Sequence, residues 1–150
     1  MDLLEGEYEP GALGWAAEQV RDYEASDGRE ANILLDNPSW PIVVITSRGA
    51  SSGKLRKNPV MRVEHGGVYA AVASKGGAPE QPSWYHNFVA DPVVQLQDGP
   101  QPALYRARIA SGSERAEWWD RAVAQYAPYA EYQENTDREI PVFLLEPVDG

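Results

Sequence analysis

Short runs of β-branched and aromatic residues, separated by glycine-rich turns, dominate the chain from residue 41 onward. The first run is residues 42–46, and the second, residues 55–63, contains Pro59, which suggests an edge strand or a bulge. Gly66-Gly67 predicts a hairpin turn into a third strand at residues 68–73. Three further strands are expected at residues 93–97, 104–109 and 142–145.

Helical periodicity appears between these runs and before them. Residues 12–25 place Trp15, Ala16, Val20 and Tyr23 on one face and predict an amphipathic helix. Residues 26–40 are polar, contain Pro38 and are expected to form a loop. The remaining helices are expected from Ser83 to before Asp91-Pro92, at residues 113–125 with Ser111 or Ser113 as N-cap, and after Pro128.

About six short strands joined mostly by hairpins indicate antiparallel pairing. The predicted fold class is mainly β with inserted helices (α+β), and a closed or half-closed antiparallel barrel is the favoured architecture. A doubly wound parallel fold requires strand–helix alternation, which residues 41–74 lack. We expect one domain, with residues 1–40 as a lead-in helix and loop and residues 41–150 as the barrel.

The net charge of −10 argues against binding to nucleic acid and against anchoring on an anionic membrane. No apolar run approaches the roughly 20 residues that span a bilayer. The N-terminus lacks the features of a signal peptide, so a cytoplasmic location is expected. The absence of cysteine excludes disulfides, zinc-thiolate sites and thiol nucleophiles.

Lys and Arg residues nevertheless concentrate between Arg48 and Lys75, which favours a local anion site. Gly49 and Gly53 bracket a loop whose backbone N–H groups and hydroxyls suit a phosphate or carboxylate, and Lys54, Arg56 and Lys57 follow directly. The alternative is a β-hairpin with solvated basic residues. The spacing is not that of a Walker loop.

Two further segments carry candidate site residues. Ser74 and Lys75 follow a strand and precede two glycines, which permit close approach of a flat or phosphorylated ligand. The helix that begins near Ser83 favours an anion at its N-terminus, and Trp84 offers a flat apolar face. A structural turn and a core tryptophan are the alternatives. His86 has only His65 as a possible partner, so no metal site is expected.

Tyr126, Tyr129 and Tyr132 recur every three residues and could border a pocket that is apolar with a polar end. An aromatic seam between helix and barrel is the alternative. No Ser-His-Asp set and no carboxylate pair suited to acid–base catalysis is evident.

The order of these motifs is more specific than any one of them. Gly-x-x-x-Gly-Lys-x-Arg-x-Asn-Pro precedes Ala-Ser-Lys-Gly-Gly-Ala, then Trp-Tyr-x-Asn, Ala-Asp-Pro and Glu-Arg-Ala-Glu-Trp-Trp. The tyrosine cluster and Thr-Asp-Arg-Glu-Ile-Pro-Val complete the order. Across roughly residues 40–147 the chain resembles the deazaflavin (F420)-dependent nitroreductase family of actinobacteria.

The resemblance implies a split antiparallel β-barrel of the flavin-binding oxidoreductase type. It also implies reduced F420 as cofactor and quinones, nitroaromatics or unsaturated lactones such as coumarins as acceptors. The coenzyme contacts it implies are Ala50, Ser51, Ser52, Arg56, Lys57, Asn58, Pro59, Val60, Met61, Val72, Ala73, Ser74, Lys75, Ser83, Trp84, Tyr85, His86 and Asn87. The tyrosines and Met61 would border the acceptor, and Ser74, Tyr126 and Tyr129 are the candidate catalytic donors.

Ala50 and Ser51 stand where family members often carry basic residues, and Met61 where some carry tyrosine. Two alternatives stay open: an FMN-dependent oxidoreductase on the same fold, and a non-catalytic F420-binding carrier or sensor. The expected partner is a small-molecule electron acceptor, and homodimerisation is left open.

Overall fold

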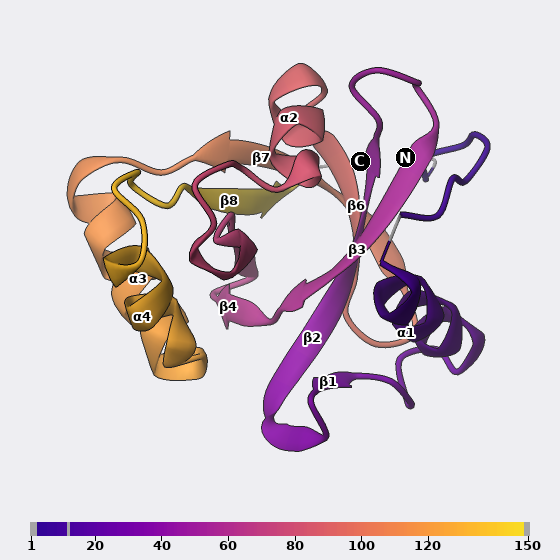
Figure 1. Ribbon diagram of the computed structural model, residues 1–150. Coiled ribbons are helices and arrows are strands. Elements are labelled where there is room, and N and C mark those ends of the chain that lie inside the picture. Colours follow the sequence, from indigo (N-terminus) through magenta and orange to yellow (C-terminus); the bar gives the residue numbers. More distant parts are fainter. Residues whose placement is uncertain (1–2, 12, 149–150) are drawn as a thin grey trace.

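One long strand, β2, organises the sheet because it pairs with three other strands. The computed structural model describes residues 3–11 and 13–148, and every pairing between its named strands is antiparallel (Figure 1). The strands are β1 (Ile33–Leu34), β2 (Asn37–Arg48), β3 (Leu55–Met61), β4 (Val63–His65), β5 (Val68–Val72), β6 (Val93–Gln97), β7 (Pro102–Ile109) and β8 (Val142–Pro147). The helices are α1 (Gly14–Ala25), the 3-10 turn η1 (Lys75–Gly77), α2 (Ser83–Ala90), α3 (Gly112–Gln125) and α4 (Pro128–Glu134).

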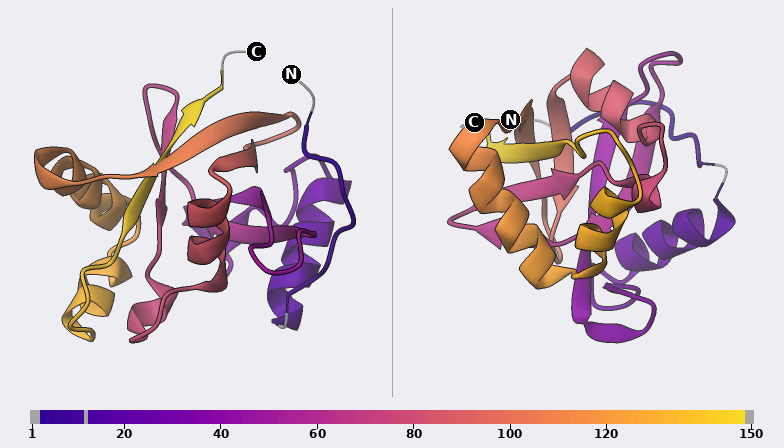
Figure 2. Two further views of the ribbon diagram at one scale, coloured as in Figure 1. Left: turned by 90° about the horizontal axis from the view of Figure 1, so that it is seen from above. Right: turned by 60° about the vertical axis from the view of Figure 1, so that its left-hand side comes forward.

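The sheet closes because β3 and β4 are separated by one residue, Arg62. The strand order is β1-β2-β6-β7-β8-β5-β4, and β3 pairs with the other edge of β2. The two ends of the sheet therefore meet at Arg62, whose Nε atom donates a 2.8 Å hydrogen bond to Asp98 after β6. This arrangement is the expected split barrel, and Figures 1 and 2 show the strongly curled sheet.

Alternate residues of the strands build apolar clusters on both faces of the sheet. Val43 and Ile45 of β2 belong to an inner cluster with Phe88 of α2 and Phe143 of β8. Ile42 and Val44 point the other way and pack under α1, against Val20 and Tyr23. A third cluster fixes α3 and α4 to the outer face of β5 and β8. Figure 2 shows α1 and the α3–α4 pair against different parts of the sheet.

Most predicted elements are confirmed, and their boundaries move by a few residues. Pro59 lies in an edge strand, since β3 pairs along its length only with β2 among the named strands. Gly66 and Gly67 both have positive φ, 60° and 84°, as a type I′ hairpin turn requires. Ser111 occupies the N-cap position of α3, but its side chain makes no capping hydrogen bond.

The loop predicted for residues 26–40 is wrong in part. Ile33–Leu34 forms β1, and β2 already begins at Asn37, because Leu34 and Trp40 pack on the apolar clusters beneath them. Trp15 is also misplaced by the helical pattern: it is 57% exposed, whereas Val20 and Tyr23 are buried.

The division into residues 1–40 and 41–150 stays a prediction. The first two residues, Ala12 at the expected helix start, and the last two residues lie outside the described part of the chain. Within the described ranges, no helix has the length and apolar character needed to cross a bilayer.

Candidate functional site

Two neighbouring cavities bring most of the predicted site residues together. One, of about 530 Å³, is lined by the loop after β2, by Arg56 and by the start of α2; we call it the charged cavity. The other, of about 520 Å³, is lined by the tyrosines and by Trp84; we call it the aromatic cavity. The residues that line both are Leu13, Ala16, Asn58, Lys75 and Ser83. The site can therefore accept one elongated ligand with an anionic end and a flat aromatic end.

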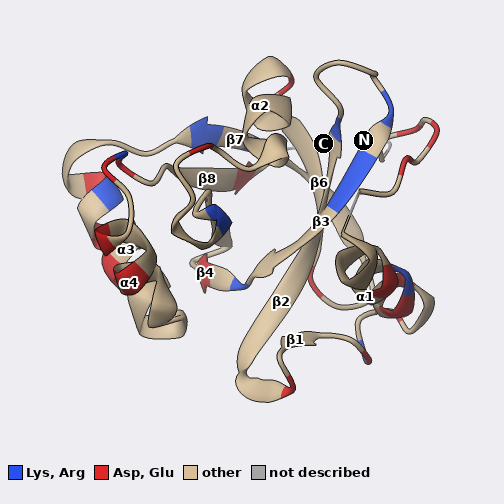
Figure 3. Cartoon of the chain, viewed as in Figure 1, with Lys and Arg blue, Asp and Glu red and all other residues tan. Residues whose placement is uncertain are grey.

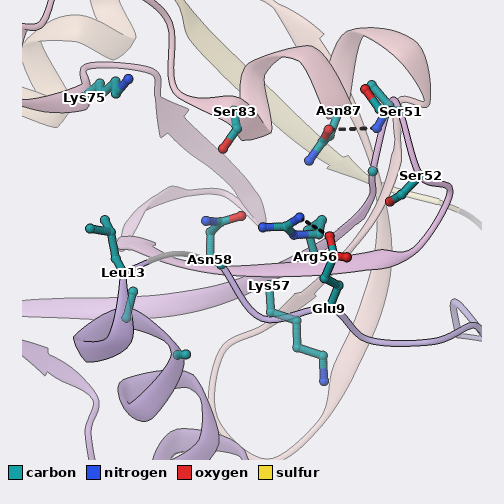
Figure 4. A pocket seen from close by; sticks show the side chains of 15 residues that line it. Glu9, Leu13, Ser51, Ser52, Arg56, Lys57, Asn58, Lys75, Ser83 and Asn87 are labelled. Atoms are coloured by element: carbon teal, nitrogen blue, oxygen red, sulfur yellow. Dashed lines mark hydrogen bonds and ion pairs between the residues drawn. The ribbon is translucent and has the colours of Figure 1, made fainter.

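The loop between β2 and β3 forms one wall of the charged cavity. The Gly49 N–H donates to the Lys54 oxygen at 2.7 Å and the Gly53 N–H donates to the Gly49 oxygen at 2.9 Å, which closes the turn. The Ala50 N–H donates to Oδ1 of Asn87 on α2 at 2.9 Å (Figure 4). Asn87 therefore positions the loop, and Ser51 and Ser52 line the cavity beside it.

The cations of the site differ in where they point. The Nη1 atom of Arg56 lies 2.6 Å from Oε1 of Glu9 at the cavity wall, and Lys75 Nζ lies 3.3 Å from Oε1 of exposed Glu80. Lys57 instead places Nζ 2.6 Å from Oε2 of Glu24 on α1 and 5.0 Å from the Tyr8 ring centroid. Figure 4 shows its ammonium pointing away from Arg56 and Asn58. Arg56 and Lys75 are thus the better candidates to bind an anion.

Basic residues gather near this cavity while carboxylates dominate the helices. Figure 3 shows Lys and Arg on β3 and the upper part of β2, and Asp and Glu on α1, α3 and α4. A local positive region inside an acidic protein can concentrate an anionic ligand. The anion site expected from the sequence stays a prediction.

The tyrosine cluster is both core and cavity wall. Pro128 starts α4, so Tyr126 caps α3 while Tyr129 and Tyr132 sit one turn apart on α4. Tyr126 and Tyr129 are buried, their ring centroids are 4.9 Å apart, and both line the aromatic cavity with Tyr132. The Tyr126 and Tyr132 hydroxyls are 3.1 Å apart.

Burial raises the pKa of both Tyr126 and Tyr129 above that of an ordinary phenol. The neighbouring tyrosine hydroxyls raise the two pKa values further. These phenols therefore stay neutral at physiological pH and can donate a hydrogen bond.

Ser74 and Trp84 complete the aromatic cavity. Ser74 follows β5, is 8% exposed, and its hydroxyl makes no hydrogen bond within the described residues. Trp84 is also mostly buried, with its ring centroid 4.8 Å from Phe88 and 5.8 Å from Phe143. It belongs to the inner core and still lines the cavity, so the core interpretation and the ligand-wall interpretation both apply.

Three predicted contacts lie outside both cavity linings. Ala73 is fully buried in the inner core, and His86 is exposed. The ring centroid of Tyr85 lies 5.6 Å from that of Phe143. Their implied coenzyme contacts remain predictions. The other predicted residues, including Pro59, Val60, Met61 and Val72, line one cavity or both.

Arg138 supports the site from outside the two cavity linings, and the sequence assigned it no role. Its guanidinium donates to the backbone oxygens of Ala73, Ser74 and Ala78 at 3.1, 2.9 and 3.0 Å, and to Gln81 Oε1 at 2.8 Å. It therefore holds the loop that carries Ser74 and Lys75. The Thr-Asp-Arg-Glu-Ile-Pro motif contained the signal, but nothing in it indicated which loop Arg138 would reach.

That loop is also fixed against α4. Gly77 has φ of +84°, and a Cβ atom there would lie 2.8 Å from the Tyr132 backbone oxygen. Only glycine allows this approach, so the Ser74–Lys75 loop and the tyrosine helix pack as one unit.

The N-terminal segment supplies a group of lining residues that sequence reasoning missed. They come from α1 and the stretch before it: Glu9, Gly11, Leu13, Trp15, Ala16 and Ala17. Leu13 and Trp15 are 61% and 57% exposed, which leaves apolar surface at the cavity. No motif in residues 1–40 pointed to them.

The split barrel and its two neighbouring cavities are compatible with a coenzyme-binding oxidoreductase. The family model described as F420H(2)-dependent quinone reductase matches residues 15–147. A Mycobacterium tuberculosis protein named F420H(2)-dependent quinone reductase is 32% identical over 126 residues, covering 82% of this chain and 83% of the relative.

Two solved structures agree with this result. One, described as an F420-H2 dependent reductase, is 56% identical with a TM-score of 0.68, and the match covers 71% of this chain and 94% of the other. A second, described as a domain-swapped dimer, is 50% identical with a TM-score of 0.70 and covers 86% and 92%. The chain belongs to the F420H2-dependent quinone reductase family and is an oxidoreductase that uses reduced coenzyme F420.

Proposed function

We propose that this protein transfers hydride from reduced F420 to electron-poor organic acceptors: quinones first, and also nitroaromatics and unsaturated lactones such as coumarins. The observation that supports this proposal most directly is that the charged and aromatic cavities are neighbours and share the lining residues Asn58, Lys75 and Ser83. F420 has the matching shape, a flat deazaflavin attached to a phosphate and an acidic tail. The donors and the aromatic wall present in the site fit that group.

Different residues of the chain would bind the two ends of the coenzyme. Arg56, Lys75 and the loop at Ala50–Ser52 hold the phosphate and tail, while Trp84, Val60 and Val72 form the wall for the ring. When bound, reduced F420 supplies the hydride. The protein holds the deazaflavin ring and the acceptor in contact, and this positioning is the main way in which it accelerates such a transfer.

Neutral hydroxyl groups would stabilise the negative charge that develops on the acceptor during hydride transfer. Hydride arrival places negative charge on the acceptor oxygen, and a hydrogen bond donor preorganised there lowers the barrier. Tyr126, Tyr129 and Ser74 are the candidate donors, because their hydroxyl-bearing side chains line the aromatic cavity. Met61 and Tyr132 complete the proposed acceptor wall.

The cofactor assignment is tested by titrating the protein with F420 and with FMN and following fluorescence. Family membership favours F420, and tighter binding of FMN would overturn the assignment. An acceptor panel of menadione, a nitroaromatic and a coumarin then defines the substrate range. Binding of F420 without oxidation of its reduced form by any acceptor would favour the carrier or sensor alternative.

A homodimer is a further part of this proposal. It is supported by the 50% identical structure described as a domain-swapped dimer. Light scattering on the purified protein measures the oligomeric state, and a monomer at every concentration would contradict it. The cytoplasmic location expected from the sequence stays a prediction.

A further inference from the structure

The segment before α1 pairs with the first residue of β3, Leu55, and forms what we call the N-terminal strap, residues 7–9. The Leu55 N–H donates to the Glu7 oxygen at 2.7 Å, and the Glu9 N–H donates to the Leu55 oxygen at 2.9 Å. Tyr8 forms a parallel β-bridge with Leu55 between these two bonds. The strap is thus held by its backbone, which leaves its side chains free to serve other contacts.

The Glu9 carboxylate lies at the wall of the charged cavity. Its Oε1 atom accepts a 2.6 Å charge-assisted hydrogen bond from Nη1 of Arg56, and its Oε2 atom is 3.7 Å from Lys54 Nζ (Figure 4). Glu9 and Arg56 both line that cavity. The cation best placed to bind an anionic ligand therefore already has an anionic partner from the protein itself.

A carboxylate and the anionic part of F420 use the same donors. If a phosphate or tail carboxylate occupied Arg56 while Glu9 stayed in place, two like charges would share one guanidinium at unfavourable cost. We propose that Glu9 is an internal competitor for the acidic tail: binding of the coenzyme exchanges Glu9 for a coenzyme anion on Arg56. This inference rests on the proposed function, and it makes Glu9 a determinant of coenzyme affinity.

The structure makes this exchange inexpensive. The side chains of Glu9 and Arg56 are 42% and 30% exposed, and ion pairs in contact with water contribute little to stability. The displaced carboxylate keeps Lys54 as a neighbour, and the backbone bonds of the strap do not involve the Glu9 side chain. Glu9 can therefore turn away while the strap remains on β3.

The test compares Glu9→Gln with Glu7→Gln. Both variants remove one negative charge from the strap, but the Glu7 side chain is 74% exposed, its one ion pair within the described residues is with Lys54 at 3.8 Å, and Glu7 does not line the cavity. F420 affinity is measured by fluorescence titration at low and at high salt. Glu9→Gln should bind F420 roughly threefold more tightly than the wild type at low salt, the size expected for a partly exposed ion pair. The gain should shrink at high salt because the repulsion is screened.

A second ligand distinguishes effects on binding of the tail from effects on binding of the ring. The deazariboflavin fragment that lacks the phosphate and the acidic tail should bind the wild type and Glu9→Gln equally. The melting temperature without ligand shows whether either variant disturbs the fold.

Each outcome decides the question. Equal F420 affinities in wild type and Glu9→Gln overturn the exchange. Weaker F420 binding by Glu9→Gln also overturns it, because Glu9 would then orient Arg56 for the ligand. An equal gain in Glu7→Gln reduces the effect to net charge and overturns the specific role of Glu9. Absence of F420 binding by the wild type overturns the proposed function as well, so the two failures are distinguishable.

Discussion

The guanidinium of Arg138 donates a 2.9 Å hydrogen bond to the backbone oxygen of Ser74, a residue 64 positions earlier in the chain. The same guanidinium also reaches the oxygens of Ala73 and Ala78. A side chain outside both cavity linings thereby fixes the loop that presents Ser74 and Lys75. The backbone of this loop is strained, because Lys75 is not glycine and yet adopts a positive φ of 46°. The Arg138 hydrogen bonds help to keep the loop in this conformation.

Arg138→Lys should weaken F420 binding by roughly tenfold, because lysine keeps the charge but lacks the planar fork that serves several acceptors together. Fluorescence titration well below the melting temperature measures the affinity. Arg121→Lys is the control, since Arg121 lies on α3 and pairs with exposed Glu117. A lower melting temperature with unchanged F420 affinity would reduce Arg138 to a purely structural role.

Arg56→Ala or Lys75→Ala should weaken F420 binding at least roughly tenfold, since charge-assisted hydrogen bonds contribute about 1.5–3 kcal/mol each. Lys57→Ala is the matched comparison, because the Lys57 ammonium points at Glu24 on α1. It should change affinity much less and instead lower the free energy of unfolding by about 1 kcal/mol. Equal affinity losses in all three variants would show that only total positive charge matters.

Tyr126→Phe or Tyr129→Phe should reduce turnover while leaving F420 affinity nearly intact. Each change deletes a hydroxyl at the aromatic cavity and keeps the buried ring. The loss could reach about a hundredfold where the hydroxyl acts chiefly in the transition state, and it shrinks if Ser74 is the main donor. Single-turnover oxidation of reduced F420 measures it, with Ser74→Ala alongside.

Truncation to alanine gives the complementary result. Because both rings pack in the outer cluster, Tyr126→Ala or Tyr129→Ala should cost about 3–5 kcal/mol of stability. Wild-type turnover in both phenylalanine variants would leave the tyrosines as walls of the pocket only.

Stability should fall in alkali. Burial raises the pKa of Tyr8, Tyr23, Tyr69, Tyr105, Tyr126 and Tyr129 above the ordinary value of 10.0. The unfolded chain therefore releases these protons first, so stability is fully present below pH 10 and is lost as pH rises toward the higher folded values. Denaturant unfolding from pH 8 to 11 measures the slope. Tyr126→Phe should flatten it, and an unchanged slope would contradict the assigned burial effect.

The sequence predicted the elements whose signal is local. Gly66-Gly67 requires positive φ at both residues of a tight turn, and the run from Val43 to Ile45 favours a strand in almost any context. The loop expected before residue 41 failed because the strand there depends on packing: Trp40 lies against Tyr126, with ring centroids 4.9 Å apart. Contacts between residues that distant leave no trace in a local pattern.

Some residues of the candidate site could likewise be predicted from a local pattern, and others could not. The glycine-bracketed loop and the tyrosine repeat pointed to Ser52 and Tyr129, and the fold places both in cavity walls. The roles of Glu9 and Arg138 could not be predicted from the sequence, because their contacts with Arg56 and with Ser74 form only when the chain folds. Lys57 shows the converse, since its position in a basic run did not reveal that its ammonium turns toward Glu24.

The central claim is that the paired cavities hold reduced F420 with its ring in the aromatic cavity, next to a quinone. The most direct measurement is a single-turnover experiment under anaerobic conditions, in which protein loaded with reduced F420 is mixed with menadione and the return of the oxidised F420 absorbance is followed. The account predicts stoichiometric oxidation at a rate that saturates with menadione and falls in Tyr126→Phe or Tyr129→Phe. Reoxidation no faster than that of free reduced F420 under the same conditions would contradict it.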